Sequence, residues 1–169
     1  MIVDVQNAMF LHDDAALFNG EKVLDNIRNL IKKARDSKMP VIYIQHTEQA
    51  DDQFAEGSFT WRIHSAITPL KDDIIVQKTT CDSFHKTNLQ EELALRNIDS
   101  LVIAGMQTEF CIDTTCRRAF SMGYHNILVE DAHSTFDSRV LSGSQIVEHH
   151  NNILGGGFVQ LKKTDEIVF

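Results

Sequence analysis

The sequence contains few of the residues that stabilise secreted proteins. It has three cysteines and two prolines among 169 residues. An odd and small number of cysteines argues against a disulfide framework and fits a reducing compartment. The first residues also lack a basic segment followed by the apolar stretch of a secretion signal. We therefore expect a cytoplasmic protein.

Positive charge and long apolar runs are also scarce. Lysine and arginine total 16 against 24 aspartates and glutamates, which gives a net charge of −8. A nucleic-acid-binding protein usually presents a basic face, which this balance disfavours. No apolar run approaches the roughly 20 residues that cross a bilayer. The composition therefore predicts a globular protein that binds neither nucleic acid nor membrane.

Short β-branched runs alternate with helical patterns along the chain, which is typical of an α/β fold. Strands are expected at 2–5, 41–44, 74–76, 101–104, 126–129 and 158–161. Helices are expected at 23–34, 87–96 (opened by a capping box at Thr87), 109–122 and 138–153. The aperiodic stretch 47–71 is predicted to be a functional lid or a binding loop. No linker or repeat interrupts the pattern, so we predict a single domain over residues 1–169.

The segment from Ala104 to Cys111 carries the clearest chemical signal. It follows the apolar run 101–103 and precedes a predicted helix, so Cys111 is expected in the first turn of that helix. Unpaired N–H groups and the helix dipole favour a thiolate there. The carboxyl ends of parallel strands are also where ligands bind. Cys111 is therefore a candidate nucleophile.

Two charged residues lie at or near other predicted strand ends. Asp4 falls inside an apolar strand, and Lys78 follows residues 74–77. Each residue has a plain structural explanation: a turn carboxylate for Asp4, a surface lysine for Lys78 and a small core side chain for Cys111. Taken together, an acid, a cation and a thiol at neighbouring strand ends form a nucleophile with its base and charge partner. We therefore predict a catalytic triad.

The chain resembles the isochorismatase-like cysteine hydrolases, relatives of nicotinamidase and N-carbamoylsarcosine amidase. The matching segments occur in the right order and spacing at 2–7, 77–78, 82–84, 104–111, 114–119, 122–124 and 130–132. The resemblance implies a three-layer fold with a six-stranded, mostly parallel sheet ordered 3-2-1-4-5-6 and helices on both faces. It also implies a homodimer or homotetramer and a small-molecule substrate.

The resemblance further implies a mechanism. Cys111 would attack a carbonyl carbon to form a thioester, Asp4 would transfer protons, and Lys78 would balance the charges. A cis peptide bond would join Met106 and Gln107, and the N–H groups of Gln107 and Cys111 would form the oxyanion hole. Thr108 either holds this turn or acts as an ordinary helix N-cap.

The histidines do not form a recognisable metal site. Nicotinamidases carry an Asp-x-His metal motif after the second strand, whereas this chain has His46 there and His64 further on. We expect these two histidines to have pocket or structural roles, and we expect no metal and no cofactor. His149 and His150 are expected to cap the C-terminus of the last helix.

Five further side chains are candidates for binding the substrate, although each of the aromatic ones also suits the core or a subunit interface. They are Phe10, Trp61, Phe84, Met106 and Phe110. Two functions remain open. The first is a metal-independent cysteine hydrolase that acts on a C–N bond of a small amide or related acyl compound. The alternative is a non-catalytic binding protein that keeps the fold; the intact triad favours the enzyme.

Overall fold

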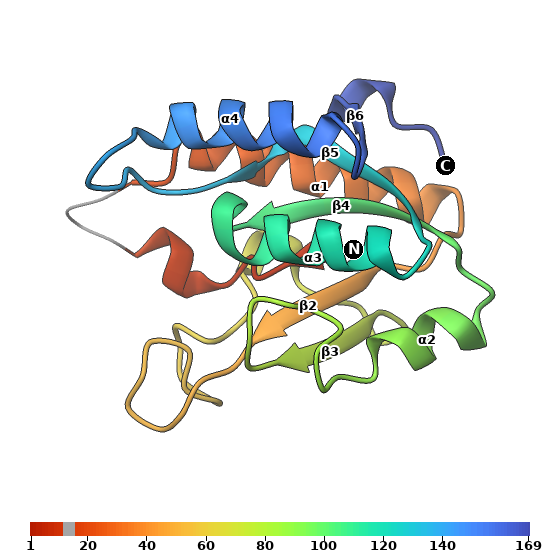
Figure 1. The fold of residues 1–169 in the computed structure, drawn as a ribbon. Helices are drawn as coiled ribbons and strands as arrows, with labels where there is room; N and C mark the ends of the chain where they lie inside the picture. The colour runs from red at the N-terminus through yellow and green to blue at the C-terminus, as the bar shows by residue number, and fades with distance from the viewer. Residues whose placement is uncertain (12–15) are drawn as a thin grey trace.

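The structure, a computed structural model, describes residues 1–11 and 16–169. Its centre is a six-stranded parallel sheet in the order β3-β2-β1-β4-β5-β6 (Figure 1). The strands are β1 (Ile2–Val3), β2 (Ile42–His46), β3 (Ile74–Lys78), β4 (Ser100–Met106), β5 (His125–Ser134) and β6 (Gln160–Lys162). The predicted fold class and strand order are confirmed.

Helices cover both faces of this sheet. The α-helices are α1 (Gly20–Asp36), α2 (Leu89–Leu95), α3 (Asp113–Ser121) and α4 (Gly143–Gly155). Short 3₁₀ turns are η1 (Asn7–Phe10), η2 (Ser65–Ile67) and η4 (Thr164–Glu166), and η3 (Thr108–Ile112) is a π-helical turn. Within the described part of the chain, no helix has the length and apolar character needed to span a bilayer.

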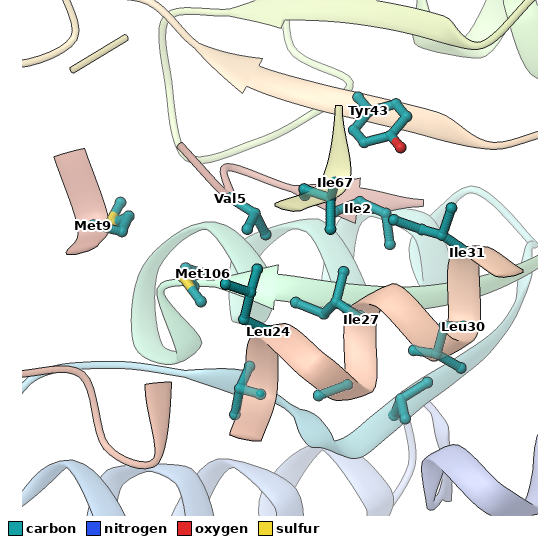
Figure 2. Close-up of a cluster of buried hydrophobic side chains, with 14 of the residues drawn as sticks. Ile2, Val5, Met9, Leu24, Ile27, Leu30, Ile31, Tyr43, Ile67 and Met106 are labelled. Carbon is teal, nitrogen blue, oxygen red and sulfur yellow. The ribbon is translucent and has the colours of Figure 1, made fainter. Parts of the chain in front are cut away.

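Two apolar clusters join the helices to the sheet. On one face, α1 presents a stripe at helical spacing that includes Leu24, Ile27 and Ile31, and this stripe packs against the side chains of β1 and β2 (Figure 2). On the other face, Leu93 of α2 and Leu154 of α4 share a cluster with the buried residues of α3. Because both faces of the sheet are covered, the central strands β1 and β4 are apolar over most of their length.

At two helix starts the capping interactions differ from the prediction. The last helix begins at Gly143 rather than near residue 138, because Ser142 and Gln145 form a reciprocal capping box there. The capping box predicted at Thr87 does not form. The Thr87 hydroxyl instead donates to the Ser83 carbonyl and accepts from the Leu89 N–H, while the helix itself is present as α2.

The carboxyl ends of β1 and β4 approach each other unusually closely. Val3 pairs with Gly105, and the Gly105 backbone has a φ of +134°. A Cβ atom added at Gly105 would lie 2.0 Å from the Val3 carbonyl oxygen, so a larger residue does not fit. This contact brings Asp4, which follows Val3, next to the segment that leads into Cys111.

Candidate active site

Asp4 occupies a turn directly after β1. The predicted strand 2–5 ends at Val3, and Asp4 adopts a left-handed backbone with a φ of +51°. Aspartate tolerates this conformation better than most residues, which explains the early end of the strand. The Asp4 N–H donates to the Ile44 carbonyl at 3.0 Å, and the side chain is buried. The carboxylate is thus fixed at the edge of the sheet.

Lys78 ends β3, and its side chain is buried. The ammonium nitrogen lies 2.7 Å from Oδ2 of Asp4 and 3.0 Å from the Thr80 carbonyl. It also lies 3.1 Å from the Cys111 sulfur and 3.3 Å from Nδ1 of His46. An ammonium has three N–H donors, so the longer contacts with sulfur and imidazole compete for the last of them. The structure therefore brings Asp4, Lys78 and Cys111 together, as the sequence predicted.

Cys111 belongs to the π-helical turn η3. The sequence predicted a regular helix over 109–122, but the chain forms this turn first and then α3. The Gln107 carbonyl accepts hydrogen bonds from the N–H groups of Phe110 and Ile112. A π turn adds a residue to the helical repeat and is frequent at functional sites. Cys111 is 8% exposed, with its sulfur against Lys78.

Burial is the main factor that opposes thiolate formation at Cys111. Burial, followed by the neighbouring Asp4 carboxylate, raises the pKa of the Cys111 thiol above its ordinary value, and Lys78 only partly offsets this. Burial also opposes the charge on Lys78, but Asp4 and Cys111 outweigh it and raise the pKa of the ammonium. The raised pKa favours a thiol at Cys111, within 4.8 Å of the Asp4 carboxylate that is paired with Lys78.

His46 also belongs to this cluster, through contacts that the sequence did not predict. Its Nδ1 faces Lys78, and its Nε2 lies 3.5 Å from the Glu48 carboxylate. Burial and then the Lys78 charge lower the pKa of His46, which favours the neutral ring as an acceptor for the ammonium. The side-chain amide of Gln6 bonds both backbone polar groups of His46. His46 pairs with Lys78 in the β2–β3 register, so a prediction of that strand pairing would have placed His46 beside Lys78.

The cluster contains the atoms of a potential metal site. One ligand atom each from Asp4, His46 and Cys111 lie within 4.8 Å of one another. The Lys78 ammonium contacts all three residues and so occupies the place of a cation. A divalent ion would have to displace this charge or bind against its repulsion. The residues present therefore suit a lysine-centred site better than a metal centre.

The predicted oxyanion segment follows β4. The peptide bond between Met106 and Gln107 is cis, as the resemblance implied. Gln107, not Thr108, is the N-cap of η3, so the N-cap alternative for Thr108 is wrong. The Thr108 hydroxyl is instead hydrogen-bonded to the buried His133, which in turn contacts Asn151. His133 and Asn151 carry no signal in the sequence, because their link to Thr108 depends on the packing of β5 and α4.

The predicted substrate-binding side chains lie in different environments. Phe110 is 50% exposed beside Cys111, whereas Met106 is fully buried in the core on the α1 face (Figure 2). Phe84 is buried in the cluster that contains Cys111 and stacks on Tyr124. Phe10 and Trp61 pack at the edge of the α1-face cluster. Substrate contact stays a prediction for these residues, and Met106 packs as a core residue.

Three other histidines considered in the sequence, His64, His149 and His150, lie in or at the start of helical turns. His64 caps η2 by accepting from the Ala66 N–H, and its ring contacts Phe10. His149 and His150 lie inside α4, which continues to Gly155, so their predicted role as C-terminal caps is wrong. The His150 ring lies 2.8 Å from the Ile146 carbonyl one turn earlier.

Proteins related in sequence align with most of this chain. The isochorismatase domain family model matches residues 1–144. The isochorismatase family protein YrdC of Bacillus subtilis is 34% identical over 142 residues, which cover 82% of this chain and 74% of YrdC. The ureidoacrylate amidohydrolase RutB of Cronobacter sakazakii is 26% identical over 167 aligned positions, covering 78% of this chain and 72% of RutB.

A solved structure shares the fold. The crystal structure of an isochorismatase family protein superposes with a TM-score of 0.90 at 31% identity, covering 96% of this chain and 95% of the other. The match extends across the sheet and both helical layers rather than one motif. The chain therefore belongs to the isochorismatase family of hydrolases.

Proposed function

We propose that this hydrolase is a metal-independent cysteine amidohydrolase, which cleaves a C–N bond of a small amide or related acyl compound through a thioester. The observation that carries the proposal is the position of the Lys78 ammonium, 2.7 Å from the Asp4 carboxylate and 3.1 Å from the Cys111 sulfur. An acid–base group, a charge partner and a nucleophile in mutual contact are the requirements of covalent acyl transfer.

The proposed reaction begins with proton transfer from the Cys111 thiol to Asp4. Oδ1 of Asp4 is buried and accepts no hydrogen bond within the described part of the chain, which leaves a lone pair for this proton. The sulfur then forms a bond to the substrate carbonyl carbon, and the carbonyl electron pair moves to the oxygen. Asp4 becomes neutral when it accepts the proton. Until the sulfur bonds to carbon, the Cys111 thiolate therefore replaces Asp4 as the anion beside Lys78.

Collapse of the tetrahedral intermediate breaks the C–N bond. The leaving nitrogen takes the proton from Asp4, which becomes a carboxylate again and pairs with Lys78. Asp4 then removes a proton from a water molecule that attacks the thioester, and the C–S bond breaks as the acid product forms. The returning proton restores the Cys111 thiol, so the enzyme ends in its starting state.

We assign the oxyanion hole to the backbone N–H groups of Gln107 and Cys111. Support comes from the turn itself, since Gln107 immediately precedes η3 and its carbonyl oxygen is bonded within that turn. One such donor is typically worth about 10²–10³ in rate. The choice of a C–N bond draws on the similarity to ureidoacrylate amidohydrolase, whose name describes amide hydrolysis.

The alternative, a binding protein that retains the fold, does not account for the buried ion pair. Removing two charges from water costs several kcal/mol per ion even in real proteins. Asp4 and Lys78 are buried despite this cost, next to a cysteine whose sulfur lies within 4.8 Å of the carboxylate and 3.1 Å from the ammonium. A protein that only binds a ligand has no chemical need for this arrangement.

The test is an activity screen over small amides, carbamoyl compounds, lactams and hydroxamates, followed by acid quench and mass spectrometry. A hydrolysed substrate should leave its acyl group on Cys111. Cys111→Ala should abolish turnover and labelling without unfolding the protein, and Cys111→Ser should also be inactive because a hydroxyl is much harder to ionise. Cys81→Ala is the matched control, since Cys81 is a free cysteine outside the triad. Full activity in Cys111→Ala would overturn the mechanism.

A further inference from the structure

A chain of side-chain hydrogen bonds runs from α4 to the turn that contains Cys111. Oδ1 of Asn151 lies 2.8 Å from Nε2 of His133, and Nδ1 of His133 lies 2.9 Å from the Thr108 hydroxyl. The Asn151 amide nitrogen donates to the Glu130 carbonyl at 3.2 Å. Thr108 and His133 are both buried. These hydrogen bonds thus join α4 and β5 to Thr108, the residue that follows Gln107.

The direction of these bonds determines which imidazole nitrogen carries the proton. The Asn151 amide nitrogen faces the Glu130 carbonyl, so the Asn151 oxygen faces His133 and can only accept. Nε2 of His133 must therefore be protonated. Burial lowers the pKa of His133 to about 4, so the ring is neutral and Nδ1 carries a lone pair. The Thr108 hydroxyl consequently donates its hydrogen to Nδ1.

We propose that His133 is a positioning residue, which holds Thr108 and thereby the backbone from Gln107 to Cys111 in the geometry that stabilises the oxyanion. This inference rests on the proposed function, because it concerns the donors assigned there. Thr108 lies between the two proposed donors and begins the π turn. Its hydroxyl is anchored to β5 through His133, so a shift of the sheet or of α4 is transmitted to the turn. A displacement of about 1 Å is enough to cost about 10²-fold in rate.

A purely structural role for His133 would be to satisfy a buried polar group. The two roles differ in what happens to Cys111. A structural role affects the stability of the whole fold, whereas a positioning role affects the oxyanion donors in a protein that remains folded. The experiment must therefore compare one reaction of Cys111 that needs those donors with one that does not.

Two reagents make this comparison without knowledge of the natural substrate. 4-Nitrophenyl acetate acylates the sulfur through a tetrahedral oxyanion and releases 4-nitrophenolate. Iodoacetamide alkylates the same sulfur by displacing iodide, and no oxyanion forms. Peptide fragmentation assigns each adduct to Cys111 rather than to Cys116, which shares the surrounding peptide. The ratio of the two rate constants reports the oxyanion donors, because changes in thiol ionisation affect both reactions.

Thr108→Val and His133→Leu are expected to lower this ratio by about tenfold to a hundredfold, with the alkylation rate little changed. His133→Asn should recover most of the acylation rate, because its amide oxygen can replace Nδ1 as the acceptor for Thr108. The double variant Thr108→Val/His133→Leu should be no slower than the slower single variant, since both changes break the same bond. His125→Asn is the matched control, because His125 is exposed on the same strand.

Losses that add in the double variant, or an unchanged ratio in folded Thr108→Val, would overturn the proposal. Imidazole nitrogen NMR of the unmodified protein provides a test that needs no variant to fold: the proton must lie on Nε2 of a neutral ring at pH 7. A ring protonated on Nδ1 would also overturn it. If Cys111 of the wild type resists both reagents, the proposed function fails with it. If Cys111 reacts and the ratio does not change, the inference alone fails.

Discussion

The Lys78 ammonium lies 2.7 Å from Oδ2 of Asp4, and both side chains are withdrawn from water, with 0% and 1% of their surfaces exposed. Neither charge can be removed alone without leaving the other buried and unpaired. The ion pair is therefore part of the fold as well as part of the chemistry. It also bridges the two strands on either side of β2, since Asp4 follows β1 and Lys78 ends β3.

Lys78→Met should lower the free energy of unfolding by about 3–5 kcal/mol, because it leaves the Asp4 carboxylate buried without a partner. The double variant Asp4→Asn/Lys78→Met should regain much of this loss while staying inactive. Urea denaturation of the wild type and the variants measures these unfolding free energies. The matched control is Lys32→Met, which breaks an exposed pair with Asp36 and should cost at most about 1 kcal/mol. A double variant as unstable as Lys78→Met would contradict this account.

The stability of the protein should fall in acid partly through His133. Burial lowers the pKa of His133 to about 4 from 6.5, so the unfolded chain binds this proton more readily than the folded protein. The contribution of the neutral His133 ring to the unfolding free energy is complete above pH 6.5. It decreases as the pH falls from 6.5 towards 4, and about 3 kcal/mol of stability is lost at pH 4. His133→Asn removes the titrating group.

Urea denaturation of the wild type and His133→Asn at pH 7.5 and pH 4 measures this contribution. The difference in unfolding free energy between the two proteins should shift by about 3 kcal/mol against the wild type at the lower pH. Using the difference cancels the titration of other groups. A difference that does not change with pH would show that His133 is protonated equally in both states.

Exhaustive chelation should leave hydrolysis unchanged. The ligand atoms of Asp4, His46 and Cys111 lie within 4.8 Å of one another, but the Lys78 ammonium contacts all three residues. Its positive charge should keep a divalent cation out. Activity before and after dialysis against a chelator, together with elemental analysis of the purified protein, tests this expectation. Stoichiometric zinc whose removal stops turnover would show that the cluster is a metal centre.

Gly105→Ala should prevent folding or lower the unfolding free energy by more than about 4 kcal/mol. The new Cβ would lie 2.0 Å from the Val3 carbonyl, on a backbone with a φ of +134° that alanine rarely adopts. Circular dichroism and urea denaturation measure the effect. Gly157→Ala is the matched control, because nothing lies within 4 Å of an added Cβ there. A stable Gly105→Ala protein would mean that β1 and β4 can separate at this point.

The sequence by itself predicted the α/β class, because apolar periodicity and strand-forming runs are local properties of the chain. Lys78 and Cys111 were identified by the same local signals, since each follows an apolar run at the end of a strand. Asp4 was identified because a carboxylate in an apolar segment is costly without a partner. The strand order came from the family resemblance, and the structure confirmed it.

Tertiary structure alone decided the interactions between distant segments. Three such interactions are the approach of Val3 to Gly105, the position of His46 against Lys78 and the bonds from Asn151 through His133 to Thr108. They join residues that are 18 to 102 positions apart. The same holds for the ionisation of Cys111: a helix start favours its thiolate, but burial and Asp4 favour the thiol. Desolvation and charge pairing depend on which groups the fold brings together, so a linear pattern does not contain them.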